Sequence, residues 1–504
     1  MKKHLILLVF SFLGYSVISN AQYFEDAYRF SNTNYSLGST ARMQSIAGAQ
    51  IALGGDISSA VSNPAGLGFF NKSVFVVTPS LDFINADTEF GIVRGSGFES
   101  QGSEETFRNN FNFANIGTVI NFGKGRFTDD KFKGGSLAIS LSRNNSYHLN
   151  RTYEGANDYN SIIDNILQEA GNSSLDELSE LGYAAYDQFL ITPITDGYGS
   201  FVGGYPIQRE NIAERGSHYQ MNIAWGGNYD DIFYFGGGMG VQLLNYKRER
   251  AYEEFDFIDG MDSLNAIFID DELTARGRGI NFNVGAIFRP VPFLTVGASY
   301  TSPSFMTIDE ESYLDLDAEW EAGTSYTETV DGETTTYDLG TIDPYQSALF
   351  VNKYRLRTPS KVGVGAALFV GKNGFLSGDL EFIDYSRASL NSNDFSTAQD
   401  NDDIENIYEP VMNVRVGGEY RFDSFRLRAG YAFFPDPVQD SSLQDRTNVT
   451  FGFGYRTVDY FVDFAVVSSM YQKQAVPYFI ASDQPVATSD VQNTTVSVTF
   501  GLNF

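Results

Sequence analysis

Cysteine is absent from the 504 residues of the sequence. A disulfide framework is therefore excluded, and the chain has no acceptor cysteine for the lipid that anchors a lipoprotein. Stability in an oxidising compartment must then come from another source. A large closed β-barrel has such a source in its continuous ladder of backbone hydrogen bonds.

Histidine is nearly absent as well, because only His148 and His218 follow the N-terminal segment. Two separated histidines give no axial pair for haem, and no Gly-x-Ser-x-Gly motif indicates a serine hydrolase. A barrel phospholipase, which would use a serine and a histidine facing lipid, is disfavoured. The acidic run from Asp400 to Glu405 lacks the spacing of a calcium-binding loop, and we interpret it as a solvated segment. We predict no enzyme, no cofactor and no metal site.

Basic residues are few: 34 Lys and Arg stand against 63 Asp and Glu, which gives a net charge of −29. Such a chain does not suit nucleic acid, which requires a positive surface. The net charge also argues against attraction to anionic lipid headgroups. The acidic residues lie mainly in the long connections, where they keep exposed segments soluble.

Long apolar runs are missing beyond the N-terminus. Met1-Lys2-Lys3-His4 precedes an apolar stretch from Leu5 to about Val17, and Ser19-Asn20-Ala21 follows. This order predicts a signal peptide over residues 1–21, with cleavage after Ala21. A membrane anchor is the alternative, but the apolar run is shorter than the roughly 20 residues that a spanning helix needs.

Aromatic residues are abundant, with 43 Phe and 30 Tyr. A transmembrane barrel uses such residues in the apolar band and the girdles that face lipid, whereas its other face is polar. The slightly negative mean hydropathy of −0.21 agrees with this division.

Fourteen stretches with strand character begin at about residue 73, and many alternate between apolar and polar residues. In the segment 280–288, for example, Ile280, Phe282 and Val284 share one face, opposite Asn281 and Asn283. The expected spans are 73–83, 111–122, 135–146, 218–229, 232–248, 277–288, 294–301, 354–369, 374–384, 412–422, 425–432, 447–455, 460–467 and 491–504.

The connections between these stretches distinguish a barrel from a soluble β-sandwich. Long connections, such as 147–217 and 302–353, alternate with shorter ones such as 230–231 and 423–424. Nothing forces this alternation in a sandwich, whereas outer-membrane barrels have long extracellular loops and short periplasmic turns. We predict a 14-stranded antiparallel transmembrane barrel over 73–504, with both termini in the periplasm. The alternating last strand ends at Phe504, which is typical of substrates of the outer-membrane assembly machinery.

Residues 22–72 precede the first strand and contain short helical patterns, from Ala41 to Ala52 and from Asp56 to Ser62. A segment of this length predicts a helical hatch inside the barrel. The connection 147–217 also has helical character, with an apolar stripe at Ile162, Ile163 and Ile166. The stripe packs within its own loop or offers a landing site for an apolar ligand.

The hatch segment contains a motif made of Gly38-Ser39-Thr40-Ala41-Arg42-Met43, Gly48-Ala49 and Asp56-Ile57-Ser58-Ser59-Ala60-Val61-Ser62-Asn63-Pro64-Ala65-Gly66-Leu67. This motif resembles the hatch of the FadL family of outer-membrane transporters. Weaker matches to the same family follow at 358–365, 379–387 and 427–431.

The resemblance implies a fourteen-stranded barrel with an N-terminal hatch, and uptake of hydrophobic compounds such as fatty acids or aromatic hydrocarbons. It makes Asn63, Pro64, Ala65 and Gly66 the candidate ligand-binding or gating element. An apolar solute needs an apolar pocket, because entering water costs about 25 cal/mol per Å² of apolar surface. We therefore expect capture by the loops, an apolar pocket and movement of the hatch.

Charged residues on the expected lumen face form a second candidate site. Neighbouring strands lie about 4.8 Å apart, so these side chains can form a cross-strand network that braces the barrel, or one arginine can bind a ligand carboxylate. The residues are Asp379, Glu381, Arg415, Glu419, Arg421, Arg426 and Arg428.

The predicted protein is thus a passive channel in the outer membrane of a Gram-negative cell. Its expected partners are outer-membrane lipid and lipopolysaccharide, a small hydrophobic ligand and the barrel assembly machinery. Two alternatives remain open: a scaffold for protein secretion, as some similar proteins are, and a general porin. The long acidic loops, with six acidic residues between 394 and 409, leave the ligand unassigned.

Overall fold

The computed structural model describes residues 23–504, except 35, 96, 125–127, 259–262, 331–332, 440 and 442. The predicted signal peptide, residues 1–21, lies outside the described residues. No helix in the described part of the chain is long and apolar enough to cross a membrane.

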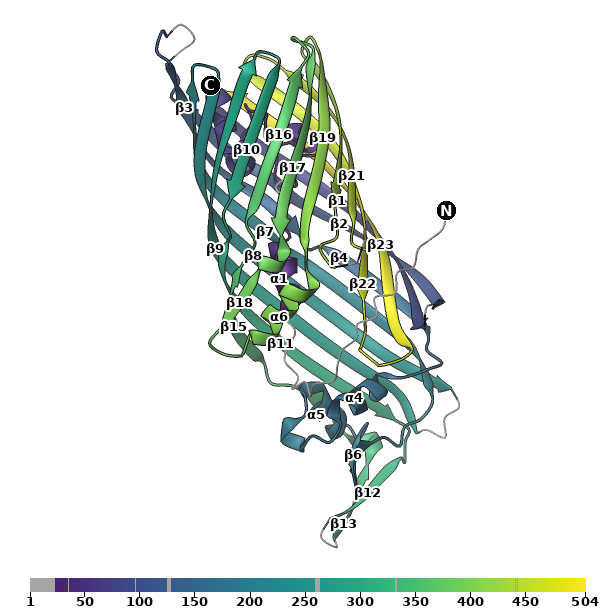
Figure 1. Ribbon diagram of the computed structural model, residues 1–504. Coiled ribbons are helices and arrows are strands. Elements are labelled where there is room, and N and C mark those ends of the chain that lie inside the picture. The colour runs from purple at the N-terminus through teal and green to yellow at the C-terminus, as the bar shows by residue number, and fades with distance from the viewer. Residues whose placement is uncertain are drawn as a thin grey trace.

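The strands form a closed, antiparallel 14-stranded barrel (Figure 1), and the predicted fold is confirmed. Closure comes from pairing of the first strand with the last, which runs from Val74 opposite Asn503 to Val93 opposite Gln484. The wall consists of β1 (Val74–Arg94), β2 (Gly97–Asn121), β3 (Phe132–Ser146) with β4 (Leu149–Ala156), β7 (Tyr205–Tyr229), β8 (Phe233–Ile258), β9 (Leu264–Val291), β10 (Leu294–Thr301) with β11 (Phe305–Trp320), β15 (Phe350–Arg357) with β16 (Lys361–Phe369), β17 (Gly374–Asp384), β19 (Pro410–Phe422), β20 (Phe425–Phe434), β21 (Arg446–Arg456), β22 (Tyr460–Ala475) and β23 (Gln484–Asn503).

Two neighbouring wall strands are interrupted side by side. β10 and β11 are separated around Pro303, and β15 and β16 around Pro359. Proline has no N–H to donate to a ladder, so the pairing stops at these residues. Ser304 and Thr358 bridge the gap, because the Ser304 N–H donates to Thr358 Oγ1 at 2.9 Å and the Thr358 N–H donates to Ser304 O at 3.0 Å.

The alternation read from the sequence corresponds to the two faces of the wall. Ile280, Phe282 and Val284 are exposed on the outside, whereas Asn281 and Asn283 are buried in the lumen. Apolar side chains are exposed in the same way on neighbouring strands, including Leu243 on β8 and Phe305 on β11. Together they form the apolar band that a transmembrane barrel presents to lipid.

Several segments expected to be loops are strands. β1 and β2 continue through most of 84–110 and turn only around Gly95, and β8 and β9 occupy most of 249–276. The apolar alternation stops where the strands leave the apolar band, so the sequence pattern ends there while the backbone ladder continues. The barrel therefore projects beyond the band on the side of the long connections.

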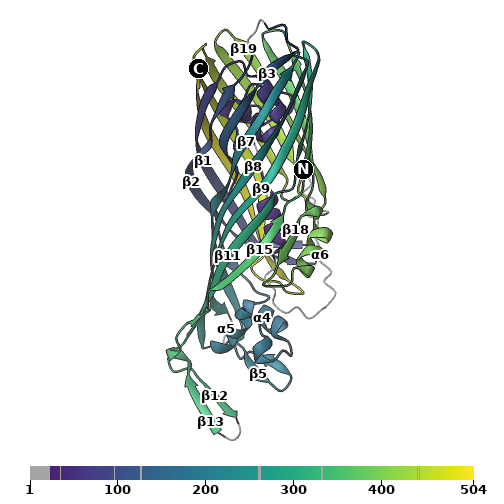
Figure 2. The same ribbon diagram turned by 90° about the vertical axis from the view of Figure 1, so that its left-hand side faces the viewer.

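The long connections fold into small elements at this projecting end (Figure 2). The apolar stripe of α4 is buried: Ile162, Ile163 and Ile166 pack in a cluster with Leu264 and Trp320 from the wall strands. The stripe thus packs on its own protein and is not a free landing site. The elements of these connections are α4 (Ile162–Ala170), α5 (Glu180–Asp187), β5 (Thr192–Ile194), β6 (Gly197–Gly199), β12 (Ser325–Val330), β13 (Glu333–Asp338), β14 (Tyr345–Gln346), β18 (Ser389–Ser392) and α6 (Ala398–Ile407), with short 3₁₀ turns η2 (Leu175–Glu177), η3 (Leu339–Thr341) and η4 (Tyr385–Arg387).

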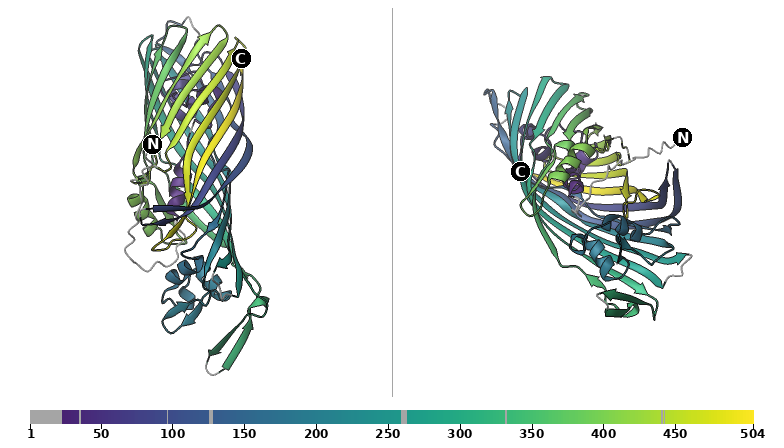
Figure 3. Two further views of the ribbon diagram at one scale, coloured as in Figure 1. Left: turned by 90° about the vertical axis from the view of Figure 1, so that its right-hand side faces the viewer. Right: turned by 60° about the horizontal axis from the view of Figure 1, so that its bottom comes forward.

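The N-terminal segment lies inside the barrel (Figure 3). α1 (Phe24–Ser31) lies toward the long connections, and the hatch follows toward the short turns as α2 (Ala41–Gln44), α3 (Ser59–Ser62) and η1 (Pro64–Phe69). The helices expected at 41–52 and 56–62 are shorter than predicted. Turns replace the remainder, because the hatch must follow the curved inner wall.

Glycines on the wall let the hatch backbone approach closely. A Cβ atom added at Gly430 of β20 would lie 2.5 Å from the carbonyl carbon of Ile46, and one at Gly417 of β19 would lie 2.5 Å from its oxygen. Any larger residue would push the hatch away from the wall.

We expect Gly430→Val to loosen the hatch and to leave the barrel closed. Overpacking of this kind costs about 1–3 kcal/mol. Hydrogen exchange of residues 41–52 should accelerate, while the barrel keeps its heat-modifiable mobility in SDS gels. Gly378→Val is the control, because a Cβ atom there meets nothing closer than the Arg415 oxygen at 3.8 Å. Equal exchange in both variants would contradict the close contact.

Candidate functional site

Asn63 is the central residue of the hatch. It is fully buried, and its side-chain oxygen accepts the Ala65 N–H at 3.1 Å, which begins η1. Its amide donates to Ile51 O at 2.7 Å, and to the wall carbonyls of Ala286 and Ala298 at 3.4 and 3.3 Å. One side chain thus joins two parts of the hatch to β9 and β10.

Pro64, Ala65 and Gly66 are packed equally firmly. Pro64 lies against Gly226 and Gly236 so closely that a Cβ atom at either glycine would lie 2.3–2.6 Å from Pro64 backbone atoms. The Gly66 oxygen accepts the Gly55 N–H at 3.1 Å. The arrangement of the motif is that of an anchor, and whether these residues gate transport stays a prediction.

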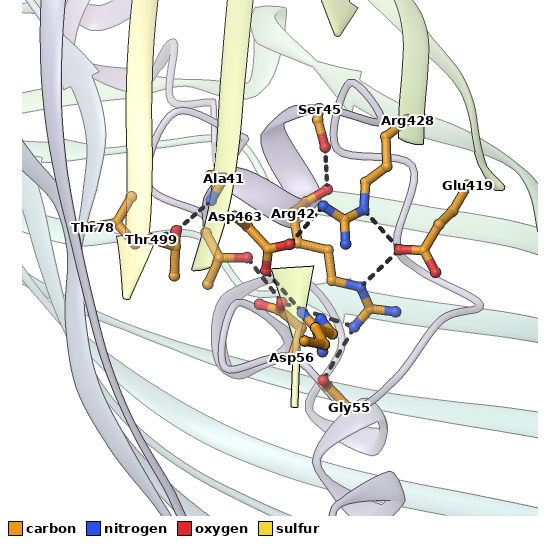
Figure 4. Close-up of polar contacts among 12 residues, drawn as sticks. Ala41, Arg42, Ser45, Gly55, Asp56, Thr78, Glu419, Arg428, Asp463 and Thr499 are labelled. Atoms are coloured by element: carbon orange, nitrogen blue, oxygen red, sulfur yellow. Dashed lines mark hydrogen bonds and ion pairs between the residues drawn. The ribbon is translucent and has the colours of Figure 1, made fainter. Parts of the chain in front are cut away.

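Arg42 connects the hatch to a buried ion network on the wall (Figure 4). Its Nε lies 3.7 Å from Glu419 of β19, and its NH1 donates to the hatch oxygen of Gly55 at 3.2 Å. Glu419 also accepts from Arg428 at 2.7 Å, and Arg428 in turn donates to Asp463 of β22 at 2.7 Å. Buried charges that are paired in this way hold the strands in one arrangement, because loss of one partner leaves another unpaired.

The predicted charge residues divide into two groups. Arg415 pairs with Glu381 at 2.8 Å, whereas Asp379 accepts the hatch N–H groups of Gln50 and Ile51 at 2.6 and 2.8 Å. Glu419, Arg421 and Arg428 form the second group.

Arg426 forms no ion pair with either group among the described residues. It lies at the β19–β20 turn, where its NH1 donates to the carbonyls of Asp423 and Phe425, both at 2.7 Å. Its place in the lumen network therefore stays a prediction.

The sequence pattern did not reveal three members of the network, namely Asp463, Arg456 and Arg42. Asp463 and Arg456 pair at 2.9 Å, and alternation around Phe464 would have placed Asp463 in the lumen. Arg42 stood in the recognised hatch motif, but no sequence pattern paired it with Glu419.

The wall has an opening between β2 and β3, which we call the wall window. β2 pairs with β3 only from Asn115 to Asn121. Its next hydrogen bonds to this side of the wall go to Asn150, from Arg108 NH1 at 2.7 Å and from Thr106 Oγ1 at 2.6 Å. A cavity of about 300 Å³ lies between these points, within the range of small-molecule sites. It is lined by Asn110, Phe111, Asn112, Phe113, Arg143, His148, Ser217 and Tyr219.

The window joins an apolar outside to a polar inside. Phe111 and Phe113 are exposed on the lipid side, whereas Arg143 is buried and pairs with Asp82 at 2.7 Å. Asp82 also accepts the amide of Asn112 at 3.0 Å. An apolar solute can therefore lie against the phenylalanines while the polar cluster keeps the lumen side closed to lipid.

A bulge in β3 produces the window. The pairing of β3 with β7 shifts between Arg143 and Asn145, and the chain leaves the β2 ladder there. The segment after α1 holds this bulge from inside: the Asn34 N–H donates to Asn144 O, and Asn145 donates to Asn32 O, both at 2.8 Å. The N-terminal segment and the window are thus in direct contact.

α1 occupies the apolar part of the lumen. Phe30 packs edge-on against Tyr147 and Tyr246, and Tyr28 against Tyr385. At its N-terminus, the N–H groups of Tyr23 and Phe24 donate to Asp400 of α6, and burial raises the pKa of this carboxyl above its ordinary value. The apolar cluster expected to bind a solute is therefore filled by the chain's own residues.

A lumen pocket between α1 and the hatch differs from the expected apolar pocket. It has a volume of about 40 Å³, and its lining includes His218, Gln220, Asn281 and Lys361. Such a space suits water and not a hydrocarbon. Among the described residues, no group of three or more His, Asp or Glu side chains is arranged to hold a metal ion.

Comparisons with known proteins agree with this architecture. A FadL homologue from Pseudomonas aeruginosa has 12% identity and a TM-score of 0.54, over 92% of this chain and 98% of that chain. The Pseudomonas putida toluene transporter TodX has 12% identity and a TM-score of 0.49, over 93% and 99%. At 12% identity, the match to the FadL homologue shows the fold alone. No functionally curated protein matches the chain in sequence.

The sequence itself matches a family in its C-terminal half. Residues 260–504 match the outer membrane protein transport proteins described as OMPP1/FadL/TodX. The members of this family are outer-membrane transporters and not enzymes, which gives the chain its location in the outer membrane. The predicted resemblance is thus confirmed: over residues 260–504 the chain is similar to the FadL/TodX family of outer membrane transport proteins.

Proposed function

We propose that the chain is a passive channel for small hydrophobic compounds, such as fatty acids or aromatic hydrocarbons, that release into the membrane through the wall window. The observation that supports this most is the cavity between Asn110–Phe113 and Arg143–His148, with two phenylalanines on its lipid side. Sideways release keeps an apolar solute out of water, where exposure costs about 25 cal/mol per Å².

The proposed orientation has the long connections outside the cell and the short turns in the periplasm. Phe504, whose N–H donates to Ser73 O at 2.9 Å, then ends the wall at the periplasmic side, where the assembly machinery would recognise it. Tyr23, the first described residue, lies in the lumen toward the long connections, packed on Phe395 with a ring separation of 4.4 Å.

The proposed route begins at α1. A solute that enters from the long connections replaces α1 in its apolar cluster, because that cluster is the large apolar surface of the lumen. Displacement of α1 pulls on Asn32 and Asn34, which hold the β3 bulge, and the window widens. The hatch, held by Asn63 and Arg42, remains in place; movement of the hatch, as the family resemblance suggests, is the competing route.

Engineered disulfides separate these two routes, since the chain has no cysteine of its own. We expect that Asn34→Cys/Asn144→Cys, once cross-linked, reduces uptake of a labelled fatty acid or toluene into liposomes to the level of empty liposomes. Reduction of this disulfide should restore uptake. Ser45→Cys/Thr450→Cys ties the hatch to β21 through a contact of 2.9 Å and should leave uptake unchanged.

The window route would be overturned if the Asn34–Asn144 cross-link left uptake unchanged while the Ser45–Thr450 cross-link abolished it. That result would favour passage through the hatch. If neither the uncross-linked protein nor the reduced variants transport any solute, and secreted proteins co-purify with the chain, the secretion scaffold is the better function. A large, unselective ion conductance of the unmodified protein would favour the porin.

Arg42 provides a second prediction. Arg42→Met leaves Glu419 and Asp56 without their hatch cation, and loss of one partner from a buried network costs about 3–5 kcal/mol. We expect the hatch to loosen and the ion conductance of the barrel in planar bilayers to rise. Arg387→Met, at a side chain that is 80% exposed in a long connection, is the control and should conduct like the unmodified protein. An unchanged conductance of Arg42→Met would show that the network does not hold the hatch.

A further inference from the structure

Basic side chains gather on the outside of one part of the wall, just beyond the apolar band. Strand alternation directs Ala275, Gly277 and Gly279 of β9 inward, and Arg276 and Arg278 outward. On β15, Tyr354 and Leu356 are buried, whereas Lys353, Arg355 and Arg357 are exposed. β11 lies between these strands, and Figure 2 shows the three together on the wall that faces the viewer.

The pairing register aligns these residues across the three strands. Thr307 of β11 lies opposite Arg278 on one side and opposite Arg355 on the other. Phe305 is the next outward residue of β11 toward the apolar band. It lies opposite Ile280 on one side and opposite Arg357 on the other. Strands about 4.8 Å apart place Arg278 and Arg355 within reach of one anion above Thr307.

Four of these cations form no ion pair within the described chain. They are Arg276, Arg278, Arg355 and Arg357, whereas Lys353 pairs with Asp309 at 2.7 Å. Asp309 also lies opposite Arg276 in the β9–β11 register, so Arg278, Arg355 and Arg357 are the cations with no acidic residue directly opposite on β11. Like charges on adjacent strands repel one another, so an external anion stabilises the arrangement.

The height of the cluster on the wall identifies the anion. Ile280 and Phe305, both exposed, mark the edge of the apolar band, and Arg276 follows four residues beyond Ile280, or about 13 Å along the strand. This is the depth at which lipid headgroups meet the water. Guanidinium groups bind phosphate through paired hydrogen bonds, so a phosphate-bearing headgroup fits.

The far side of the barrel has an acidic row on its outer face. Asp87 of β1 lies four residues beyond Phe83, is exposed, and is opposite Asp490 of β23 and Glu105 of β2. The basic side is therefore a local feature and not a general property of the barrel rim.

We propose that Arg276, Arg278, Arg355 and Arg357 form a binding site for the phosphates of an anionic glycolipid in the outer leaflet, which we call the phosphate patch. Thr307 adds a hydroxyl between the arginines, and the acyl chains of the lipid lie on Ile280 and Phe305. The proposal rests on the proposed orientation, with the long connections outside, and does not depend on solute transport.

Native mass spectrometry of the full chain, extracted from Gram-negative outer membranes in mild detergent, tests the patch. Purified lipid A with its phosphates is the probe, and dephosphorylated lipid A is the comparison. We expect the unmodified protein to bind phosphorylated lipid A and not dephosphorylated lipid A. The variant R276Q/R278Q/R355Q/R357Q should bind at least about tenfold less, since each base near an anionic headgroup contributes roughly fivefold.

The control is R215Q/K247Q, at outward side chains that are already paired with Glu249 and Glu272 at 2.8–3.1 Å. It should bind lipid A within about twofold of the unmodified protein, because these cations have partners. Both variants must show heat-modifiable mobility in SDS gels, so that loss of the fold is recognised. Equal binding of both lipids, or equal binding by the quadruple variant and its control, would overturn the proposal. Uptake into liposomes free of lipid A is measured separately and reports only on the channel.

Discussion

Closure of one hydrogen-bonded ladder is the constraint on which the rest of the structure depends. Because β1 pairs with β23, the wall has no free edge, and each wall residue faces either the outside or the lumen. Polar side chains that face the lumen need partners there, and the hatch supplies many of them. Asp379 accepts two hatch N–H groups, and Thr499 accepts the Ala41 N–H at 2.7 Å. Wall and hatch therefore satisfy each other, and neither is complete alone.

The wall window is the place where this closure is relaxed. The ladder between β2 and β3 is lost over a few residues, and the buried pair of Asp82 and Arg143 lies directly behind the gap. The freed backbone is partly satisfied from β7, since the Tyr219 hydroxyl donates to Phe113 O at 3.2 Å. A gap that retains such partners can exist in a lipid-facing wall, where an unsatisfied carbonyl costs several kcal/mol.

The sequence predicted those features that arise from a repeating pattern. Strands could be predicted wherever the outward residues must be apolar to face lipid, as at Ile280 and Phe282. Beyond the apolar band outward residues need not be apolar, so the continuation of the strands was missed. Lumen charges on adjacent strands, such as Glu381 and Arg415, followed from alternation. The bulge near Asn144, the pairing of Arg42 with Glu419 and the seating of α1 depend on contacts between distant segments, and no local pattern encodes them.

Net charge alone does not describe the charge that headgroups meet. A value of −29 argues against anionic headgroups, but headgroups meet only some of the outward residues on the wall. Among these the β9 and β15 side carries arginines, and the side with Asp87 and Glu105 is acidic. Glu105 lies on β2, the strand that borders the window, so the acidic row repels anionic lipid from the wall beside the cavity. The proposed patch binds charged lipid on one side of the barrel, and the acidic row repels it from the other side. The window then faces lipid with little charge, into which an apolar solute is most easily released.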